Sequence, residues 1–172
     1  MKKILKLTLA AAAFLMIGSS ATHAQKFGFL DTGELITAMP EMDSVRTKLE
    51  AFNKELQDTY ELMMVEYNNK MNDYSQNLNT MSDAIRKTKE QELVSIRQRL
   101  EEFQESAPQS MQQEQAKLMA PVVEKARNAI QKVGKSNSFT AVFDLASSAL
   151  AYHDENTMTD ILQMVKNELG IK

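Results

Sequence analysis

A narrow stripe of apolar positions runs through the middle of the chain and predicts a long helix. From Glu41 onward, apolar and aromatic residues recur at intervals of three and four, as in a helix that buries one face. The 4-4-3 unit repeats every 11 residues, so the stripe stays nearly straight along the helix. The other faces are charged or amidic, which indicates pairing along one seam. The stripe comprises Val45, Leu49, Phe52, Leu56, Tyr60, Met63, Tyr67, Met71, Tyr74 and Leu78.

A second apolar stripe follows and predicts a return helix. A turn at residues 79–83 gives arms of about 38 and 50 residues, whereas a turn at Pro108 leaves about 60 Å of one arm unpaired. We therefore place the turn at 79–83, where Thr80 and Asp83 fit a capping box. Pro108 and Pro121 lie inside the return helix, so a bend is expected at each, with a helix break as the alternative. The second stripe comprises Ile85, Leu93, Ile96, Leu100, Phe103, Ala107, Met111, Leu118, Val122, Ala126, Ala129 and Val133.

Short strand patterns flank this helical region on both sides. Lys26–Leu30, Phe139–Asp144 and Leu150–Tyr152 are rich in aromatic and β-branched residues. A strand from the start of the chain can pair with strands near its end only if the hairpin returns to its root. We therefore predict a mainly α fold with a small β body, in which a small sheet closes the root of a long antiparallel helical hairpin.

A final amphipathic helix is predicted after Thr157. Thr157 and Asp160 are suited to cap its start, and Gly170 fits a Schellman-type end. The predicted domains are a coiled-coil hairpin at 41–133 and a body formed by 25–40 and 134–172.

The predicted body is too small to be stable as a single copy. Three strands of about five residues need more covering than one short helix provides, so we expect several copies to share the sheet in a homo-oligomer. The core and the subunit contacts of this body are predicted to come from Phe27, Phe29, Val142, Phe143, Leu145, Leu150 and Tyr152.

Residues 1–24 have the pattern of a secretory signal peptide. Three lysines precede the apolar segment LTLAAAAFLMIG, and the small residues of SSATHA supply a cleavage site after Ala24, with Ala21 as the alternative. An uncleaved membrane anchor needs about 20 apolar residues, more than this segment contains. No cysteine follows the apolar segment, which excludes a lipoprotein. We therefore expect an exported, soluble protein.

Composition excludes several classes of functional site. There is no cysteine, so disulfides and thiolate metal sites are impossible. After residue 24 the single histidine is His153, in a turn-like setting that favours a solvated side chain. No G-x-S-x-G, Gly-rich phosphate loop or H-E-x-x-H motif is present. We therefore predict that the protein is not an enzyme and has no catalytic residue, metal or other cofactor.

Charge differs between the two predicted arms. The chain carries −3, and −6 without the three lysines of residues 1–24, which argues against nucleic-acid binding. Residues 41–84 hold nine acidic and four basic side chains, and 85–135 hold ten basic and seven acidic ones. This opposite bias favours antiparallel pairing, although each surface pair contributes under about 1 kcal/mol.

The order of elements resembles the Skp/OmpH family of periplasmic chaperones over nearly all of the chain after residue 24. The segments that carry the resemblance are KFGFLDTGELITAMPE, LMAPVVEKARNAIQKVGKSNSFTAVFD and SSALAYHDENTMTDILQMVKNELG. The resemblance implies a jellyfish-like homotrimer in which a β-barrel-like body carries three helical tentacles around a cavity. It also implies a periplasmic holdase that binds unfolded outer-membrane proteins and prevents their aggregation, with weak membrane-surface contact. The absence of a nucleotide motif predicts that this holdase works without ATP.

Candidate client-binding residues follow from what a holdase needs, which is many weak and adaptable contacts. Methionine fits many shapes, and tyrosine offers contact area at low entropic cost. The resemblance implies basic tentacles, but the net charge of −6 favours apolar contact over electrostatic capture. The candidates are Tyr60, Met63, Met64, Tyr67, Met71, Tyr74 and Met81, with the basic cluster Arg86, Lys87 and Lys89 near the tip.

Two alternatives remain at this point. The stripe members among these candidates also fit the seam of the hairpin, which leaves Met64 and Met81 as the stronger candidates for exposed contact. An adaptor or structural protein of the cell envelope, with one defined partner, is the alternative to the chaperone.

Overall fold

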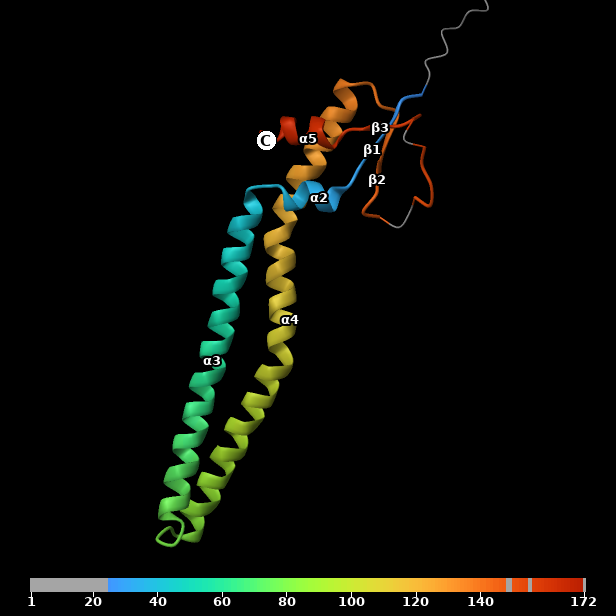
Figure 1. Ribbon diagram of the computed structural model, residues 1–172. Helices are drawn as coiled ribbons and strands as arrows, with labels where there is room; N and C mark the ends of the chain where they lie inside the picture. Colours follow the sequence, from blue (N-terminus) through green and yellow to red (C-terminus); the bar gives the residue numbers. More distant parts are fainter. Residues whose placement is uncertain (1–24, 148–149, 155, 172) are drawn as a thin grey trace, which may run out of the picture.

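The computed structural model describes residues 25–147, 150–154 and 156–171 (Figure 1). The predicted signal peptide, residues 1–24, lies outside them. Two long helices run side by side away from a small sheet, so the predicted mainly α fold with a long helical hairpin is confirmed. The elements are β1 (Phe27–Leu30), α2 (Thr32–Thr37), α3 (Glu41–Asn77), α4 (Asp83–Ser136), β2 (Ala141–Asp144), β3 (Thr159–Asp160) and α5 (Leu162–Glu168).

The hairpin turns between Asn77 and Asp83, and its cap differs from the prediction. The Ser82 hydroxyl accepts a hydrogen bond from the backbone N–H of Ile85 at 3.4 Å, so Ser82 is the N-cap of α4. Thr80 instead donates its hydroxyl to the carbonyl of Asn77 at 2.9 Å and closes the end of α3. The prediction of Thr80 as the cap is wrong because the tip loop continues two residues further before the helical backbone begins.

Both prolines of α4 are accommodated inside one continuous helix. Asp83–Ser136 includes Pro108 and Pro121 without interruption, so the alternative of a helix break is wrong. The ribbon of α4 changes direction in its yellow part (Figure 1), as expected where a proline removes a backbone hydrogen bond and crowds the preceding turn.

The sheet is parallel and has the order β2-β1-β3. Phe27–Leu30 pairs in register with Ala141–Asp144, and Gly28 and Phe29 pair with Thr159 and Asp160. The prediction of a strand at Leu150–Tyr152 is wrong: this segment is irregular, and Tyr152 is 81% exposed. The second edge of β1 is taken by Thr159–Asp160 because the next residue, Ile161, enters the core and is 0% exposed.

The final helix is shorter than predicted at its start and ends as predicted. Because Thr159 and Asp160 pair with β1, α5 begins only at Leu162, and Thr157 caps no helix. Gly170 has a φ of 73°, the left-handed conformation that glycine adopts without strain. The N–H of Ile171 donates to the carbonyl of Lys166 at 2.8 Å, and the N–H of Gly170 donates to that of Asn167 at 3.1 Å. This is the predicted Schellman end.

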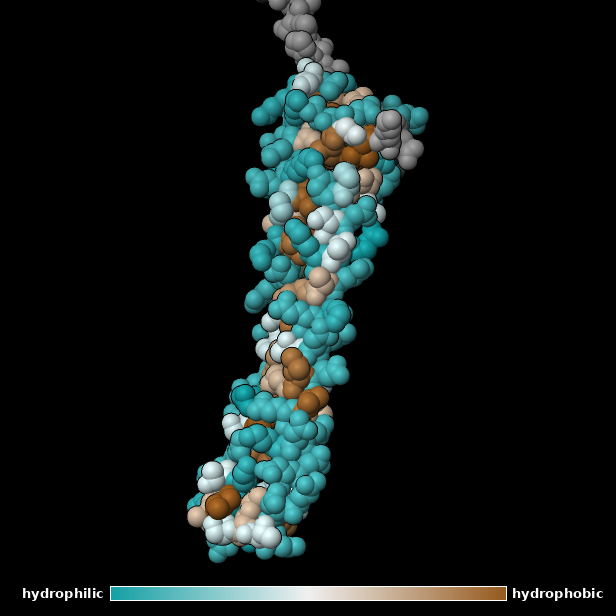
Figure 2. Space-filling model, turned by 90° about the vertical axis from the view of Figure 1, so that its left-hand side faces the viewer, coloured by the Kyte–Doolittle hydropathy of each residue, from teal (hydrophilic) through white to brown (hydrophobic). Residues whose placement is uncertain are grey.

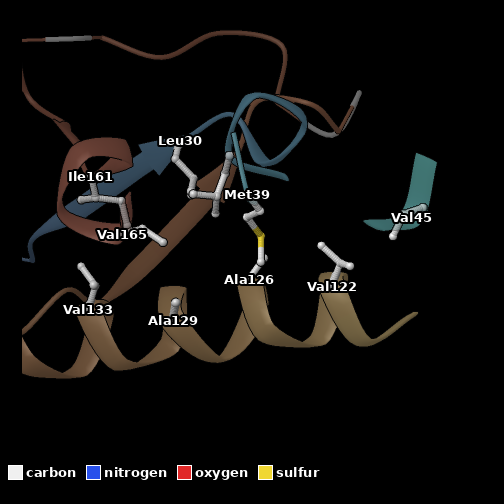
Figure 3. Packing of buried hydrophobic residues seen from close by; sticks show 10 residues of the cluster. Leu30, Met39, Val45, Val122, Ala126, Ala129, Val133, Ile161 and Val165 are labelled. Carbon is white, nitrogen blue, oxygen red and sulfur yellow. The ribbon is translucent and has the colours of Figure 1, made fainter. Parts of the chain in front are cut away.

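The core of the body lies between the sheet and the last turns of α4. One face of α4 points toward β1 and α5 (Figure 3), at the helical spacing of 4, 3 and 4 residues in Val122, Ala126, Ala129 and Val133. The predicted hairpin segment therefore contributes its final turns to the body. The remaining buried members of this cluster are Leu30, Leu35, Met39, Val45, Ile161 and Val165.

The face of β1 that enters this core is the opposite of the expected one. Gly28 and Leu30 are buried, whereas Phe27 and Phe29 are half-buried. A Cβ atom at Gly28 would lie 3.1 Å from Ile161 and 3.2 Å from Phe139, so a larger residue here would have to push these side chains aside by a few tenths of an ångström. Within one chain, the aromatic face of the sheet is therefore not the core. The other predicted core residues Val142, Phe143, Leu145 and Leu150 are also half-buried.

Candidate functional site

The stripe of α3 forms the seam of the hairpin. All ten stripe residues between Val45 and Leu78 are buried or half-buried. The Tyr60 ring stacks on Phe103 with centroids 6.5 Å apart, and its hydroxyl oxygen accepts a hydrogen bond from Nε2 of Gln104 at 2.6 Å. The Tyr74 hydroxyl donates to Oε1 of Glu90 at 2.7 Å. These contacts connect α3 to α4, so Tyr60 and Tyr74 have a structural role whatever else they bind.

The remaining Met and Tyr candidates lie beside or within this seam. All five are half-buried, which leaves part of each side chain accessible. They are Met63, Met64, Tyr67, Met71 and Met81.

The most exposed large apolar side chains of α3 are two that the sequence reasoning missed. Leu62 is 71% exposed and Val65 is 49% exposed, and they lie three residues apart on the same side of the helix. Figure 2 shows small apolar areas on a largely hydrophilic rod. The signal that could have found them is their position outside the 4-4-3 stripe, since an apolar residue on a polar helix face is solvent-exposed.

Three further exposed large apolar side chains lie on α4, of which Val123, at 37%, is close to the body. Val94 is 53% exposed, and Ile85, which was predicted to lie in the seam, is 52% exposed. That prediction is wrong: Ile85 lies in the first turn of α4, next to the tip loop, where about half of its side chain stays in solvent. We call Leu62, Val65, Ile85 and Val94 the apolar surface of the hairpin.

The basic cluster near the tip is mostly paired. Lys89 Nζ lies 3.1 Å from the Asp73 carboxylate, and Arg86 lies 3.7 Å from that of Asp83. Within the part of the chain that the structure describes, Lys87 makes no ion pair and is exposed. Only one of the three cations is therefore available to an acidic partner without breaking an existing pair.

Ion pairs across the hairpin shift the pKa values of their members. Lys70 and Glu92 are 2.5 Å apart; their hydrogen bond lowers the pKa of Glu92 and raises that of Lys70. Nearer the body, the hydrogen bond from Lys125 lowers the pKa of Glu41. The bond to Glu90 raises the pKa of the Tyr74 hydroxyl. Ionised Glu41 and Glu92 therefore stabilise the packing of α3 against α4.

Acidification is expected to weaken the hairpin through Glu92. Because the folded state lowers its pKa, the pair stabilises the fold at neutral pH, and this contribution is lost as pH falls through the folded value. In urea unfolding, Glu92→Gln should be less stable than the unmodified protein at neutral pH, and the difference should shrink as pH falls below the ordinary pKa of glutamate. Glu105→Gln, an exposed carboxylate on the same helix, is the matched control. A difference that persists in acid would contradict this role.

Candidate residues of the body outside the core have structural partners. The Asp144 carboxylate accepts hydrogen bonds from the N–H of Thr32 at 3.1 Å, the hydroxyl of Thr32 at 2.7 Å and the N–H of Ala146 at 3.0 Å. His153, predicted to be solvated, is half-buried, and its ring lies 4.7 Å from that of Phe29. The ring of Phe143 lies 6.1 Å from that of Phe27 on the same sheet face.

The described residues hold neither a helix that could span a membrane nor a cluster of metal-ligating side chains. None of their helices is both long and apolar enough to cross a membrane. In the same ranges, no group of three or more histidine and carboxylate side chains is placed to hold a metal ion.

Comparisons with known proteins agree on one family. The model of the family described as outer membrane protein (OmpH-like) matches residues 26–169. A crystal structure of a candidate outer membrane chaperone (OmpH-like) from Caulobacter crescentus superposes with a TM-score of 0.69. It is 11% identical, and the match covers 88% of either chain. At this identity the likeness shows a shared fold. Among curated proteins, no significant match is found.

Proposed function

The chain belongs to the outer membrane protein (OmpH-like) family, and from this premise we propose that it is a periplasmic holdase chaperone. It binds unfolded outer-membrane proteins after their export and keeps them from aggregating, without ATP. The similar crystal structure from Caulobacter crescentus, named as a candidate chaperone, supports this assignment.

The observation that carries the proposal is the apolar surface on an elongated charged rod. Leu62, Val65, Ile85 and Val94 are each about half exposed or more, on two helices that are otherwise hydrophilic. Isolated apolar side chains make weak contacts, and they can make them with clients of many different shapes. Met64 and Met81, half-buried beside them, add flexible thioether contacts. Because Arg86 and Lys89 are paired, client capture relies on apolar contact, with Lys87 as an accessory cation.

The body is proposed to join three copies. Phe27, Phe29 and Phe143 lie on one half-buried face of the sheet, and the exposed Tyr152 follows in the next segment. Sharing this aromatic face among copies would remove it from water and place the hairpins around a common cavity. The proposed assembly therefore supplies several apolar surfaces to one client.

Removing the exposed apolar pair of α3 is expected to weaken the holdase. Leu62→Gln with Val65→Gln should raise the protein concentration needed to halve client aggregation by about tenfold. Full burial of one such side chain contributes about 1.5–3 kcal/mol, but a client covers only part of each, so the two together contribute about 1.5 kcal/mol. The assay dilutes a urea-unfolded outer-membrane β-barrel into buffer and follows turbidity. Met64→Gln with Met81→Gln is expected to have a smaller effect in the same direction.

The matched control is Asn68→Gln with Asn72→Gln, two exposed polar positions on the same helix. It should suppress aggregation as the unmodified protein does, and all variants should keep the same helicity by circular dichroism. Undiminished suppression by the Leu62/Val65 variant would show that clients bind elsewhere. Failure of the unmodified protein to suppress aggregation would contradict the proposed function itself.

A further inference from the structure

An open groove lies in the middle of the hairpin, nearer the body than the apolar surface described above. Its volume is about 410 Å³, and both long helices contribute to its walls. Leu56, Phe103 and Met111 supply apolar surface, and Asn53, Gln57 and Gln104 supply side-chain amides. This size falls within the usual range of ligand-binding pockets, about 300–1,000 Å³.

Pro108 explains why the two helices leave a space here. Proline has no N–H group, so the carbonyl of Gln104, four residues earlier, receives no helical hydrogen bond from it. The pyrrolidine ring also crowds that turn and deflects the helix axis, and the neighbouring Ala107 leaves the wall without a large side chain. Both residues line the groove, so the backbone acceptor lies in the same turns of α4 that form its wall.

The chemistry of the lining selects an uncharged ligand. None of the side chains that line the groove carries a charge, so a charged group placed there would lose water without gaining an ion pair. Asn53 and Gln57 provide hydrogen-bond donors and acceptors, and Gln104 adds its side-chain oxygen, since its Nε2 already donates to the hydroxyl of Tyr60, which also lines the groove. An extended polypeptide backbone presents the complementary donors and acceptors, and each needs a partner when it leaves water.

We propose that this groove binds an extended, uncharged, apolar segment of an unfolded polypeptide. The segment's backbone bonds to the amides, and its apolar side chains rest on Leu56, Phe103 and Met111. This inference rests on the proposed holdase function and adds to it one defined binding site per chain. It separates two modes of contact: weak capture on the exposed apolar surface, and a seated segment at the bend of α4.

The composition of the protein allows a direct test of contact. The sequence has no cysteine and no tryptophan, so one introduced cysteine takes a bimane label and only the peptide carries a quenching indole. The probe is a blocked ten-residue peptide of alternating apolar and uncharged polar residues with one central tryptophan. Bimane on Met111→Cys, in the groove wall, should be quenched on adding peptide. Bimane on Gln109→Cys, an exposed neighbour outside the wall, should not.

The second measurement is the affinity of the peptide for a variant whose groove is filled by a larger side chain. Ala107→Phe places a ring in the groove and should lower the affinity for the dye-labelled peptide at least tenfold in fluorescence anisotropy. Ser106→Phe adds the same ring at an exposed neighbouring position and should stay within about twofold of the unmodified protein. A peptide of the same length with lysine and glutamate at the apolar positions should bind at least tenfold more weakly than the apolar one.

The outcomes separate this site from the general function. Equal quenching at positions 109 and 111, or equal affinities of the two phenylalanine variants, would overturn the groove site. If the unmodified protein suppresses β-barrel aggregation but does not bind the peptide, the groove site also fails and the holdase function stands. If Ala107→Phe unfolds the hairpin, the comparison of bimane quenching at positions 109 and 111 still decides whether the peptide binds in the groove.

Discussion

Ile161→Ala is expected to destabilise the body by about 2–5 kcal/mol, the range for truncating a fully buried isoleucine or leucine. Ile161 is 0% exposed, packs against Gly28, and extends the pairing of β3 because its N–H donates to the carbonyl of Phe29 at 2.9 Å. Its removal leaves a cavity between the sheet and α4. Because β3 is only two residues long, that edge of the sheet loses the side chain that holds it in place.

Urea unfolding followed by circular dichroism measures this loss. Ile85→Ala makes the same chemical change at a side chain that is 52% exposed, and it should alter stability by no more than about 0.5 kcal/mol. If the two variants were equally stable, Ile161 would not anchor the third strand. We also expect this variant to lose amide-exchange protection first at position 161, where the backbone N–H donates to the Phe29 carbonyl of β1.

Asp144→Ala is expected to cost about 1.5–3 kcal/mol, the value for hydrogen bonds to a charged group. The carboxylate holds the end of β2 to the start of α2, because it accepts from both the backbone and the side chain of Thr32. The same carboxylate closes the turn after β2 through the N–H of Ala146. Truncation leaves these donors without their acceptor at a junction between distant parts of the chain.

Two comparisons sharpen this second experiment. Asp144→Asn keeps one acceptor oxygen and should lose less stability than Asp144→Ala. Asp58→Ala removes an exposed carboxylate paired only with Lys54 on its own helix, so it should cost under about 1 kcal/mol. Equal losses at positions 144 and 58 in the same unfolding assay would mean that the junction contributes nothing beyond a surface charge.

The long helices were predictable because their signal repeats many times. The 4-4-3 stripe from Val45 to Leu78 covers about nine turns, so a few exceptions do not obscure the period. Matching arm lengths then placed the tip close to where α3 ends and α4 begins. The seam of α3 followed from the same pattern, since side chains of one stripe must share a partner.

The candidate site was less predictable, because exposure depends on where the two helices face each other. Leu62 and Ile85 illustrate this in opposite ways: one lay outside the stripe and was passed over, and the other lay within it and proved exposed. Pro108 was identified as a bend, but the groove beside it depends on residues from both arms. Neither arm by itself contains that information.

The sequence by itself determined the hairpin, its seam and the Schellman end at Gly170. The first two follow from apolar stripes that repeat along each helix and from arms of similar length, and the third follows from residues at one helix end. Tertiary structure alone decided that the sheet is parallel, that Thr159–Asp160 rather than Leu150–Tyr152 completes it, and that Gly28 and Leu30 face the core. A strand of four residues has the same alternating pattern on either face. Which face is buried depends on the last turns of α4 and on α5, which come far later in the chain than β1.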